Sequence, residues 1–333
     1  MLSFDETAFL QKSRSTVALR PQIEALVDRL TTKGIRNVLL VGAGGTFAAV
    51  WPYEHLAHRF STLPVRSAIA AELITSGDAS LGEGTVAVFT SVSGTTDDAL
   101  RAVEYCKAHG ALTIGFTGYA ESPLASMVDE ALISEPEAWP FDVQLLLFTT
   151  RLLSNRGEFS GYEKFADELA AIPEIMVQVA RQADAPASDF ALKHKDTNYH
   201  FLSGTGNLWG FTYLYSMCIL EEMQWLHTTR VHGAEFFHGS LELIQEDTSL
   251  LLFRGEDETR PLMDRVVDFA NKYSHNVTVV DTADYPLEGI SPEFRGLLSP
   301  LVADTAASRI SKHLEKQRDH SLDLRRYYRV VEY

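Results

Sequence analysis

The segment from Leu220 to Gly239 holds the densest group of side chains that exchange protons near neutral pH. It reads LEEMQWLHTTRVHGAEFFHG, and its acids and imidazoles are Glu221, Glu222, His227, His232, Glu235 and His238. Carboxylates and imidazoles are the side chains that enzymes most often use as general acids and bases. Helical metal sites commonly place two histidines four residues apart, whereas these histidines are five and six apart. The segment therefore predicts proton transfer without a metal.

Two loops in the first half of the chain suit a phosphate group. The first is Gly42-Ala-Gly-Gly-Thr46, and the second is Thr90-Ser-Val-Ser-Gly-Thr-Thr96. Backbone N–H groups and several hydroxyls suit a compact dianion such as a sugar phosphate. A tight turn and helix capping are the plainer interpretations of the two loops. The candidate phosphate-binding residues are Gly44, Gly45, Thr46, Ser91, Ser93 and Thr96.

These loops do not carry a nucleotide-binding motif. A dinucleotide fingerprint would read GxGxxG, but Phe47 stands where the third glycine belongs, and no Gly-Lys-Ser/Thr of a P-loop follows. We therefore expect no nucleotide and no other cofactor.

Both loops follow short β-branched runs and precede helical patterns. In the first half the expected strands are 38–41, 85–89 and 112–116, with helices over 47–60 and 97–109. Alternation of this kind is typical of an α/β fold with a doubly wound parallel sheet flanked by helices. Ligands of such sheets gather at the carboxyl ends of the strands, where both loops lie.

The second half repeats the pattern. Its expected strands are 199–202, 249–253 and 276–280, and a helix over 208–223 leads into the acid–base segment. Gly204 follows Gly42 by 162 positions and Phe253 follows Phe89 by 164, which indicates an internal duplication. The second half has Glu256-Asp-Glu258 in place of the hydroxyl loop. We infer that only the first half kept an anion-binding loop.

These patterns predict four segments. Residues 1–34 form a helical lead-in, 35–185 a first domain that binds phosphate, 190–310 a second domain with the acid–base residues, and 311–333 a tail. The tail contains Arg318, Arg325 and Arg326, so we expect it to fold over the site and hold phosphate or a substrate carboxylate. A basic tail docked elsewhere on the surface is the alternative.

Composition narrows the class of partner. The chain has 333 residues and a formal net charge of −16, so it repels nucleic acid. The N-terminus lacks the pattern of a signal peptide, and no apolar run approaches the ~18 residues of a membrane span. Two isolated cysteines, Cys106 and Cys218, fit a reducing compartment. We expect a cytoplasmic protein that binds neither membrane nor nucleic acid.

At this point the motifs resemble those of a known superfamily. Gly42–Thr46, Ser91–Thr96, and Glu222 with His238 sixteen positions later resemble the sugar isomerase (SIS) superfamily. Glu222-Met-Gln-Trp-x-His, Ala234-Glu-Phe-Phe-His-Gly239 and the C-terminal Arg325-Arg-Tyr-Tyr-x-x-Val-Glu-Tyr333 are similar to the fructosamine-6-phosphate deglycases. One departure is Ser240, where that family usually has proline after His-Gly.

The resemblance implies a fold, a reaction and roles for residues. It implies two SIS domains, each a flavodoxin-like or Rossmann-like three-layer sandwich, in a homodimer or higher oligomer that shares its sites between subunits. Glu222 and His238 would be the acid–base pair. A 6-phosphofructosyl amino acid (an Amadori product) would give glucose 6-phosphate and free amino acid through an enaminol. Further candidate substrate contacts are Glu235, His232, Arg325, Arg326 and Tyr333.

Two other functions stay open. Another SIS enzyme would use the same proton transfer, as an aldose–ketose isomerase, an amino-sugar phosphate deaminase or a glucoselysine-6-phosphate deglycase. A sugar-phosphate-sensing SIS module is the non-catalytic alternative. A sensor has no need of Glu222 and His238, and regulators of this type also need a basic DNA-binding segment, which we do not find.

Overall fold

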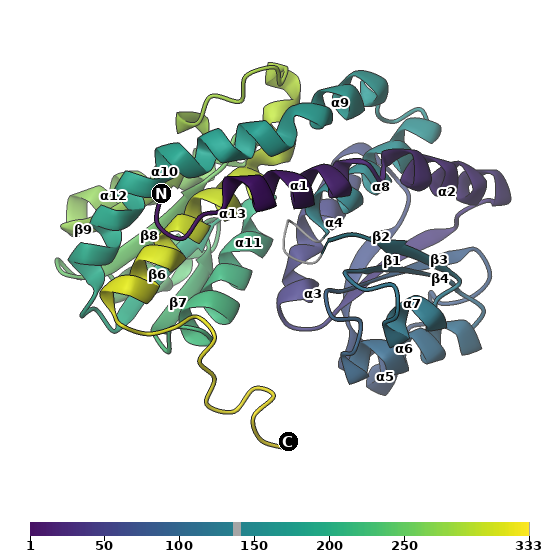
Figure 1. Cartoon of the computed structure of the whole chain (residues 1–333), viewed down its shortest axis with the longest axis horizontal. Coiled ribbons are helices and arrows are strands. Elements are labelled where there is room, and N and C mark those ends of the chain that lie inside the picture. The colour runs from purple at the N-terminus through teal and green to yellow at the C-terminus, as the bar shows by residue number, and fades with distance from the viewer. Residues whose placement is uncertain (136–140, 333) are drawn as a thin grey trace. The chain divides into compact units, whose positions relative to one another are not determined.

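The computed structural model describes residues 1–135 and 141–332, which fold as two compact units (Figure 1). The first unit is Asp5–Pro173, and the second is Met1–Phe4 together with Glu174–Tyr333. The expected helical lead-in forms α1 (Glu6–Val17) and α2 (Arg20–Lys33), both within the first unit. Pro21 stands in the first turn of α2, a position that proline favours because no N–H is needed there.

The first unit contains a five-stranded parallel sheet in the order β2-β1-β3-β4-β5. Its strands are β1 (Asn37–Gly42), β2 (Val65–Ile69), β3 (Thr85–Ser91), β4 (Leu112–Thr117) and β5 (Glu130–Ile133). The three central strands are the three that the sequence predicts. The edge strands β2 and β5 carry Arg66 and Glu130. Because these charged residues interrupt the apolar runs, the sequence patterns did not identify the two strands.

Helices cover both faces of this sheet. Alpha-helices α5 (Ala70–Ser76), α6 (Asp97–Ala108) and α7 (Pro123–Met127) pack on the face formed by Leu39 and Phe89. On the other face Phe116 packs edge-on against Phe148 of α8 (Asp142–Asn155), which also contacts α2 and α4 (Trp51–Phe60). The remaining helical elements are α3 (Gly45–Ala49), α9 (Tyr162–Glu168) and η1 (Leu169–Ala171).

The second unit has a four-stranded parallel sheet in the order β7-β6-β8-β9. Its strands are β6 (Tyr199–Gly204), β7 (His227–His232), β8 (Ser249–Arg254) and β9 (Asn276–Asp281). Numbered within each unit, both sheets place their first four strands in the order 2-1-3-4. The repeated strand order supports the internal duplication inferred from the spacing.

Helices also cover both faces of the second sheet (Figure 1). Helix α12 (Arg260–Tyr273) packs with Phe201 and Leu252 on one face. On the other face lie α10 (Ile172–His194), α11 (Leu208–Leu214) and α13 (Pro292–Gln317). The short helical turns are η3 (Phe236–His238), η4 (Ser240–Leu243) and η5 (Thr282–Asp284). The expected α/β class, with parallel sheets flanked by helices, is confirmed.

Three features differ from the expected elements. The helix expected over 208–223 is α11 followed by a π-helix, η2 (Tyr215–Glu221), and the acid–base segment then continues as strand β7. The expected helix over 47–60 breaks at Val50, because Pro52 begins a new helix. Helix α10 is continuous across 185–190, and α13 continues to Gln317, so the non-helical tail begins at Arg318 rather than at 311.

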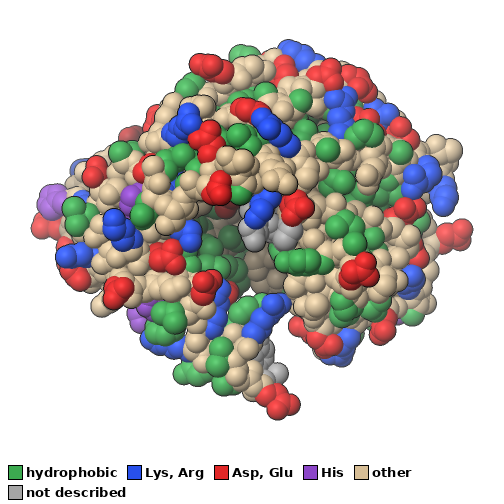
Figure 2. Space-filling view, viewed as in Figure 1, with side chains coloured by type: hydrophobic (Ala, Val, Ile, Leu, Met, Phe, Trp, Pro, Cys, Tyr) green, Lys and Arg blue, Asp and Glu red, His purple; other side chains and the backbone are tan. Residues whose placement is uncertain are grey.

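Charged residues are mixed on the visible surface. Figure 2 shows acidic and basic side chains interspersed on this face rather than separated into patches. None of the helices in the described ranges has both the length and the apolar character needed to cross a membrane.

Candidate active site

The π-helix η2 places two adjacent glutamates at its end. In a π-helix the N–H bonds the carbonyl five residues earlier, and Glu222 N–H donates to the Met217 carbonyl at 3.0 Å in this way. The chain then turns sharply, and Trp225 adopts a left-handed backbone conformation with φ of 55°. A bulky residue rarely adopts that conformation, and such strain is concentrated at functional sites.

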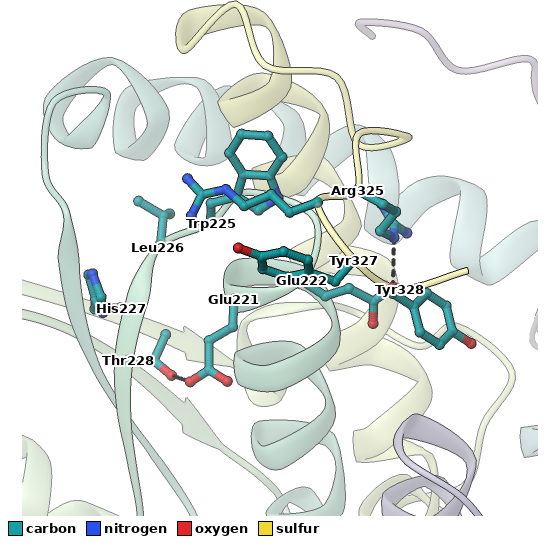
Figure 3. Close-up of a pocket in the computed structure, with 10 residues that line it drawn as sticks. Glu221, Glu222, Trp225, Leu226, His227, Thr228, Arg325, Tyr327 and Tyr328 are labelled. Atoms are coloured by element: carbon teal, nitrogen blue, oxygen red, sulfur yellow. Dashed lines mark hydrogen bonds and ion pairs between the residues drawn. The ribbon is translucent and has the colours of Figure 1, made fainter. Parts of the chain in front are cut away.

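A cavity of about 550 Å³ opens beside this turn (Figure 3). Its walls come from the end of η2, the start of β7 and the C-terminal tail. The lining residues are Glu221, Glu222, Trp225, Leu226, His227, Thr228, Arg325, Arg326, Tyr327 and Tyr328. The tail and Glu222 therefore share one cavity, which brings together two groups of residues that the sequence separates by a hundred positions.

Both glutamates in the cavity are ion-paired. Arg325 Nε donates to Glu222 Oε1 at 2.8 Å, and the two side chains are 19% and 27% exposed. Glu221 accepts a hydrogen bond from Arg230 at 2.9 Å and another from the Thr228 hydroxyl. Glu221 is thus fixed by residues of β7, whereas among the described residues the Glu222 carboxylate is paired with the tail alone.

The tail also packs on Trp225. The guanidinium of Arg326 lies 4.1 Å from the centre of the Trp225 ring, within the range of a cation–π contact. The His320 ring meets the same indole edge-on at 4.5 Å. Nearby, the buried Gln224 side chain donates to the His320 carbonyl at 2.9 Å. The tryptophan therefore serves as the platform on which the tail docks.

The other candidates of the acid–base segment lie outside the lining of this cavity. His238 ends η3 and is exposed, as is Glu235. His232 ends β7, where its Nδ1 accepts from the Ala234 N–H at 3.2 Å and its ring meets Trp209 at 5.4 Å. Tyr333 lies outside the described residues. Of the expected acid–base pair, this chain brings only Glu222 to the cavity.

The two expected phosphate loops lie at neighbouring strands of the first unit. Strands β1 and β3 are adjacent, and the chain runs from β1 to β2 toward one edge of the sheet and from β3 to β4 toward the other. Alpha/beta sheets bind ligands at such a point. The Thr90 hydroxyl donates to the Thr46 carbonyl at 3.4 Å and so joins the loops. Gly44 needs its left-handed φ of 57° for the turn.

Hydroxyls surround the second loop. Ser91 Oγ accepts from the Gly94 N–H at 3.1 Å and lies 3.3 Å from Thr96 Oγ1, and Ser93 Oγ lies 2.9 Å from Thr95 Oγ1. Thr96 precedes α6, but its side chain makes no capping hydrogen bond. Helix capping therefore does not explain the Thr96 hydroxyl.

The corresponding place in the second unit is occupied by a side chain. Asp257 is 8% exposed, and its carboxylate accepts from the N–H groups of Asn207 and Thr259, both at 2.9 Å. These donors come from the loops after β6 and β8, the counterparts of β1 and β3. The internal carboxylate satisfies amides that an external anion would otherwise use, which gives a physical reason for the asymmetry between the halves.

Neither a metal nor a reactive thiol is evident near Glu222. Within residues 1–135 and 141–332, no group of three or more His, Cys, Asp or Glu side chains is arranged to hold a metal ion. Burial, with a smaller effect of the Glu222 charge, raises the pKa of Cys218 to about 11, so its thiol stays protonated at neutral pH.

Sequence reasoning did not find every residue of the cavity. The pairing of Glu221 with Arg230 was not anticipated, because the segment between them forms a strand rather than a continued helix. Tyr327 and Tyr328 belong to the tail motif, but only the structure shows that both line the cavity. The run of aromatic and basic residues at the C-terminus is the sequence feature that could have identified these two tyrosines.

Comparisons with known proteins agree with this architecture. The SIS domain family matches residues 34–150. Fructosamine deglycase FrlB of Bacillus subtilis (strain 168) is 32% identical, over 96% of this chain and 100% of its own length. Fructoselysine 6-phosphate deglycase of Escherichia coli (strain K12) is 26% identical, over 94% and 92%.

A solved structure is similarly close. A Bacillus subtilis protein described as a phosphosugar isomerase superposes with a TM-score of 0.90 at 30% identity, covering 96% of this chain and 100% of its own. Because it covers 96% of this chain, the match to the Bacillus deglycase spans both units. The chain therefore belongs to the fructosamine deglycase family of SIS-domain enzymes.

Proposed function

We propose that the enzyme hydrolyses a 6-phosphofructosyl amino acid to glucose 6-phosphate and the free amino acid. The observation that carries the proposal is Glu222, a carboxylate on a strained turn that opens into a cavity of about 550 Å³. The deglycase names of its relatives point to the same class of substrate.

The phosphate group would bind at the loops after β1 and β3. Amide and hydroxyl donors there suit a dianion without a lysine, and the donors are Gly44, Gly45, Thr46, Ser91, Ser93 and Thr96. This local binding site also explains how a chain with a net charge of −16 attracts an anionic substrate.

The reaction needs proton transfers and one water molecule. His238 moves protons at the ring oxygen and the C2 hydroxyl and opens the sugar. Glu222 removes a proton from C1, which gives an enaminol, and protonation at C2 converts this to an imine at C1. Water adds to the imine carbon, and the C1–N bond breaks to release the amine and the aldehyde of glucose 6-phosphate. Such general acid–base catalysis contributes ~10²–10⁴-fold.

The place of His238 outside the cavity lining has a simple explanation under this proposal. The family resemblance implies sites shared between subunits, so the exposed His238 of one copy would complete the site of a second copy. A homo-oligomer of chains with two SIS domains, working in the cytoplasm, is therefore part of the proposal.

A direct assay tests the function. The purified enzyme is incubated with 6-phosphofructosyl glycine, valine and lysine, and glucose 6-phosphate is measured by a coupled dehydrogenase. We expect release of glucose 6-phosphate together with an equal amount of amino acid. Glucosamine 6-phosphate and fructose 6-phosphate serve as alternative substrates. Turnover of either one, without cleavage of any fructosyl amino acid, would assign the chain to a deaminase or an isomerase instead.

A further inference from the structure

The ion pair between Glu222 and Arg325 bears on how the proposed base becomes active. Glu222 Oε1 accepts a charge-assisted hydrogen bond from Arg325 at 2.8 Å, so this oxygen is not free to approach a substrate. Proton removal from C1 needs a carboxylate oxygen that is free to reach the C1 hydrogen. The pair as it stands in the free chain must therefore open or weaken when substrate is bound.

Arg325 is positioned to receive another anion. Its Nη1 donates to the carbonyl oxygens of Leu322 and Leu324 at 2.7 and 2.8 Å, which fixes the guanidinium to the tail. Its Nε contacts Glu222, and its Nη2 has no hydrogen-bond partner among the described residues. A guanidinium binds a carboxylate best with two parallel N–H groups, so the single bond to Glu222 leaves part of that capacity unused.

The surroundings of the pair suit the amine half of the substrate. Tyr327 and Tyr328 line the cavity on either side of Glu222, and Trp225 forms another wall (Figure 3). Among the described residues that line this cavity, the arginines that can meet an incoming anion are Arg325 and Arg326. An amino acid joined to the sugar through its α-nitrogen brings a carboxylate close to C1, where the base must act.

We propose that Arg325 determines specificity by exchanging the Glu222 carboxylate for the carboxylate of the amino acid half of the substrate. The exchange couples recognition to catalysis, because binding of the correct substrate releases the base. Adducts of amines without a nearby carboxylate leave the ion pair closed and react slowly. This inference rests on the proposed function and adds to it a preference for amines that carry a carboxylate beside the glycated nitrogen.

A matched pair of substrates tests the exchange. The 6-phosphofructosyl adducts of glycine and methylamine differ only in the carboxylate. We expect the wild-type kcat/KM to be about 10- to 100-fold higher for the glycine adduct, the range expected for a charge-assisted hydrogen bond. In Arg325→Gln this preference should disappear, and kcat for the methylamine adduct should exceed the wild-type value because Glu222 is no longer held. Arg325→Lys should restore part of the preference.

The neighbouring arginine provides the control. Arg326 stacks on Trp225 and does not contact Glu222, so Arg326→Gln should lower kcat/KM for both adducts alike. An unchanged preference in Arg325→Gln, or equal wild-type activity on the two adducts, overturns the role of Arg325 and leaves the deglycase function standing. Release of glucose 6-phosphate from neither adduct overturns the proposed function itself.

Discussion

At the residue scale, the two adjacent glutamates of η2 have different surroundings. The Glu222 carboxylate is paired with the tail residue Arg325, whereas Glu221 is held by Arg230 and Thr228 of β7. A base must be able to release its partners during the reaction. We expect the C-terminal tail to move more easily than strand β7, whose residues hold Glu221. This difference favours Glu222 as the proposed base although both carboxylates line the same cavity.

Replacement of Glu222 separates catalysis from binding. In Glu222→Gln we expect kcat to fall about 10²- to 10⁴-fold, because the amide does not accept the C1 proton. The Kd for glucose 6-phosphate should change only a few-fold, since the phosphate loops are untouched. Steady-state kinetics and calorimetric titration measure the two quantities.

The adjacent glutamate is the matched control for that variant. Glu221→Gln makes the same chemical change one residue away, so a smaller loss of kcat is expected. A larger loss of kcat in Glu221→Gln than in Glu222→Gln would reverse the assignment of the base.

The sequence predicted candidate residues better than their contacts. Residue types indicated the acid–base segment and the basic tail, the family resemblance selected Glu222 within that segment, and the structure places Glu222 and the tail at one cavity. The ion pair of Glu222 with Arg325 was not predictable, because it joins positions 103 residues apart. His238 was selected by resemblance, and its role stays a prediction because it lies outside that cavity's lining.

At the element scale, sequence patterns identify every central strand of the two sheets. Strands β1, β3 and β8 are almost wholly apolar, and all three were predicted. Strand β7 was missed because HTTRVH is polar and only half-buried, as suits an edge strand. The π-helix was also missed, because its extra residue per turn has no residue-type signature.

The loop after β8 offers a stability test. Asp257→Ala leaves the N–H groups of Asn207 and Thr259 without their acceptor in a buried place, which should cost about 1–3 kcal/mol. Urea unfolding followed by circular dichroism measures the loss. The control is Glu256→Gln, for which a smaller loss is expected because the amide oxygen still accepts from the Arg295 guanidinium. Equal stability of the two variants would contradict the buried role of Asp257.

At the scale of the whole molecule, two buried histidines link stability to pH. Burial lowers the pKa of His194 to about 4 and that of His200 to about 3, and their rings lie 5.6 Å apart. In the unfolded chain both would titrate near 6.5. Because the unfolded state then binds more protons, the free energy of unfolding falls as pH drops below about 6.5.

The expected loss is about 2 kcal/mol per histidine between pH 7 and pH 5. Thermal unfolding at stepped pH values measures it, with His200→Asn as the comparison. His200 Nδ1 lies 2.8 Å from the Ser249 hydroxyl. Asparagine keeps a hydrogen-bonding group for that hydroxyl but removes the imidazole that titrates. The decline should therefore be shallower in the variant. An equally steep decline would show that other groups control the acid sensitivity.

The attachment of the tail limits how much of the chain must move during a reaction cycle. Arg318 donates to the Lys195 carbonyl at 2.8 Å, and the Gln224 side chain donates to the His320 carbonyl. These hydrogen bonds attach the first residues of the tail to the rest of the second unit. Further along the tail, Arg325 pairs with Glu222 and Arg326 stacks on Trp225, and both contacts bind the tail to the cavity wall. We therefore expect substrate entry and product release to move the few residues beyond His320, and to leave α13 and the sheet beneath it unchanged.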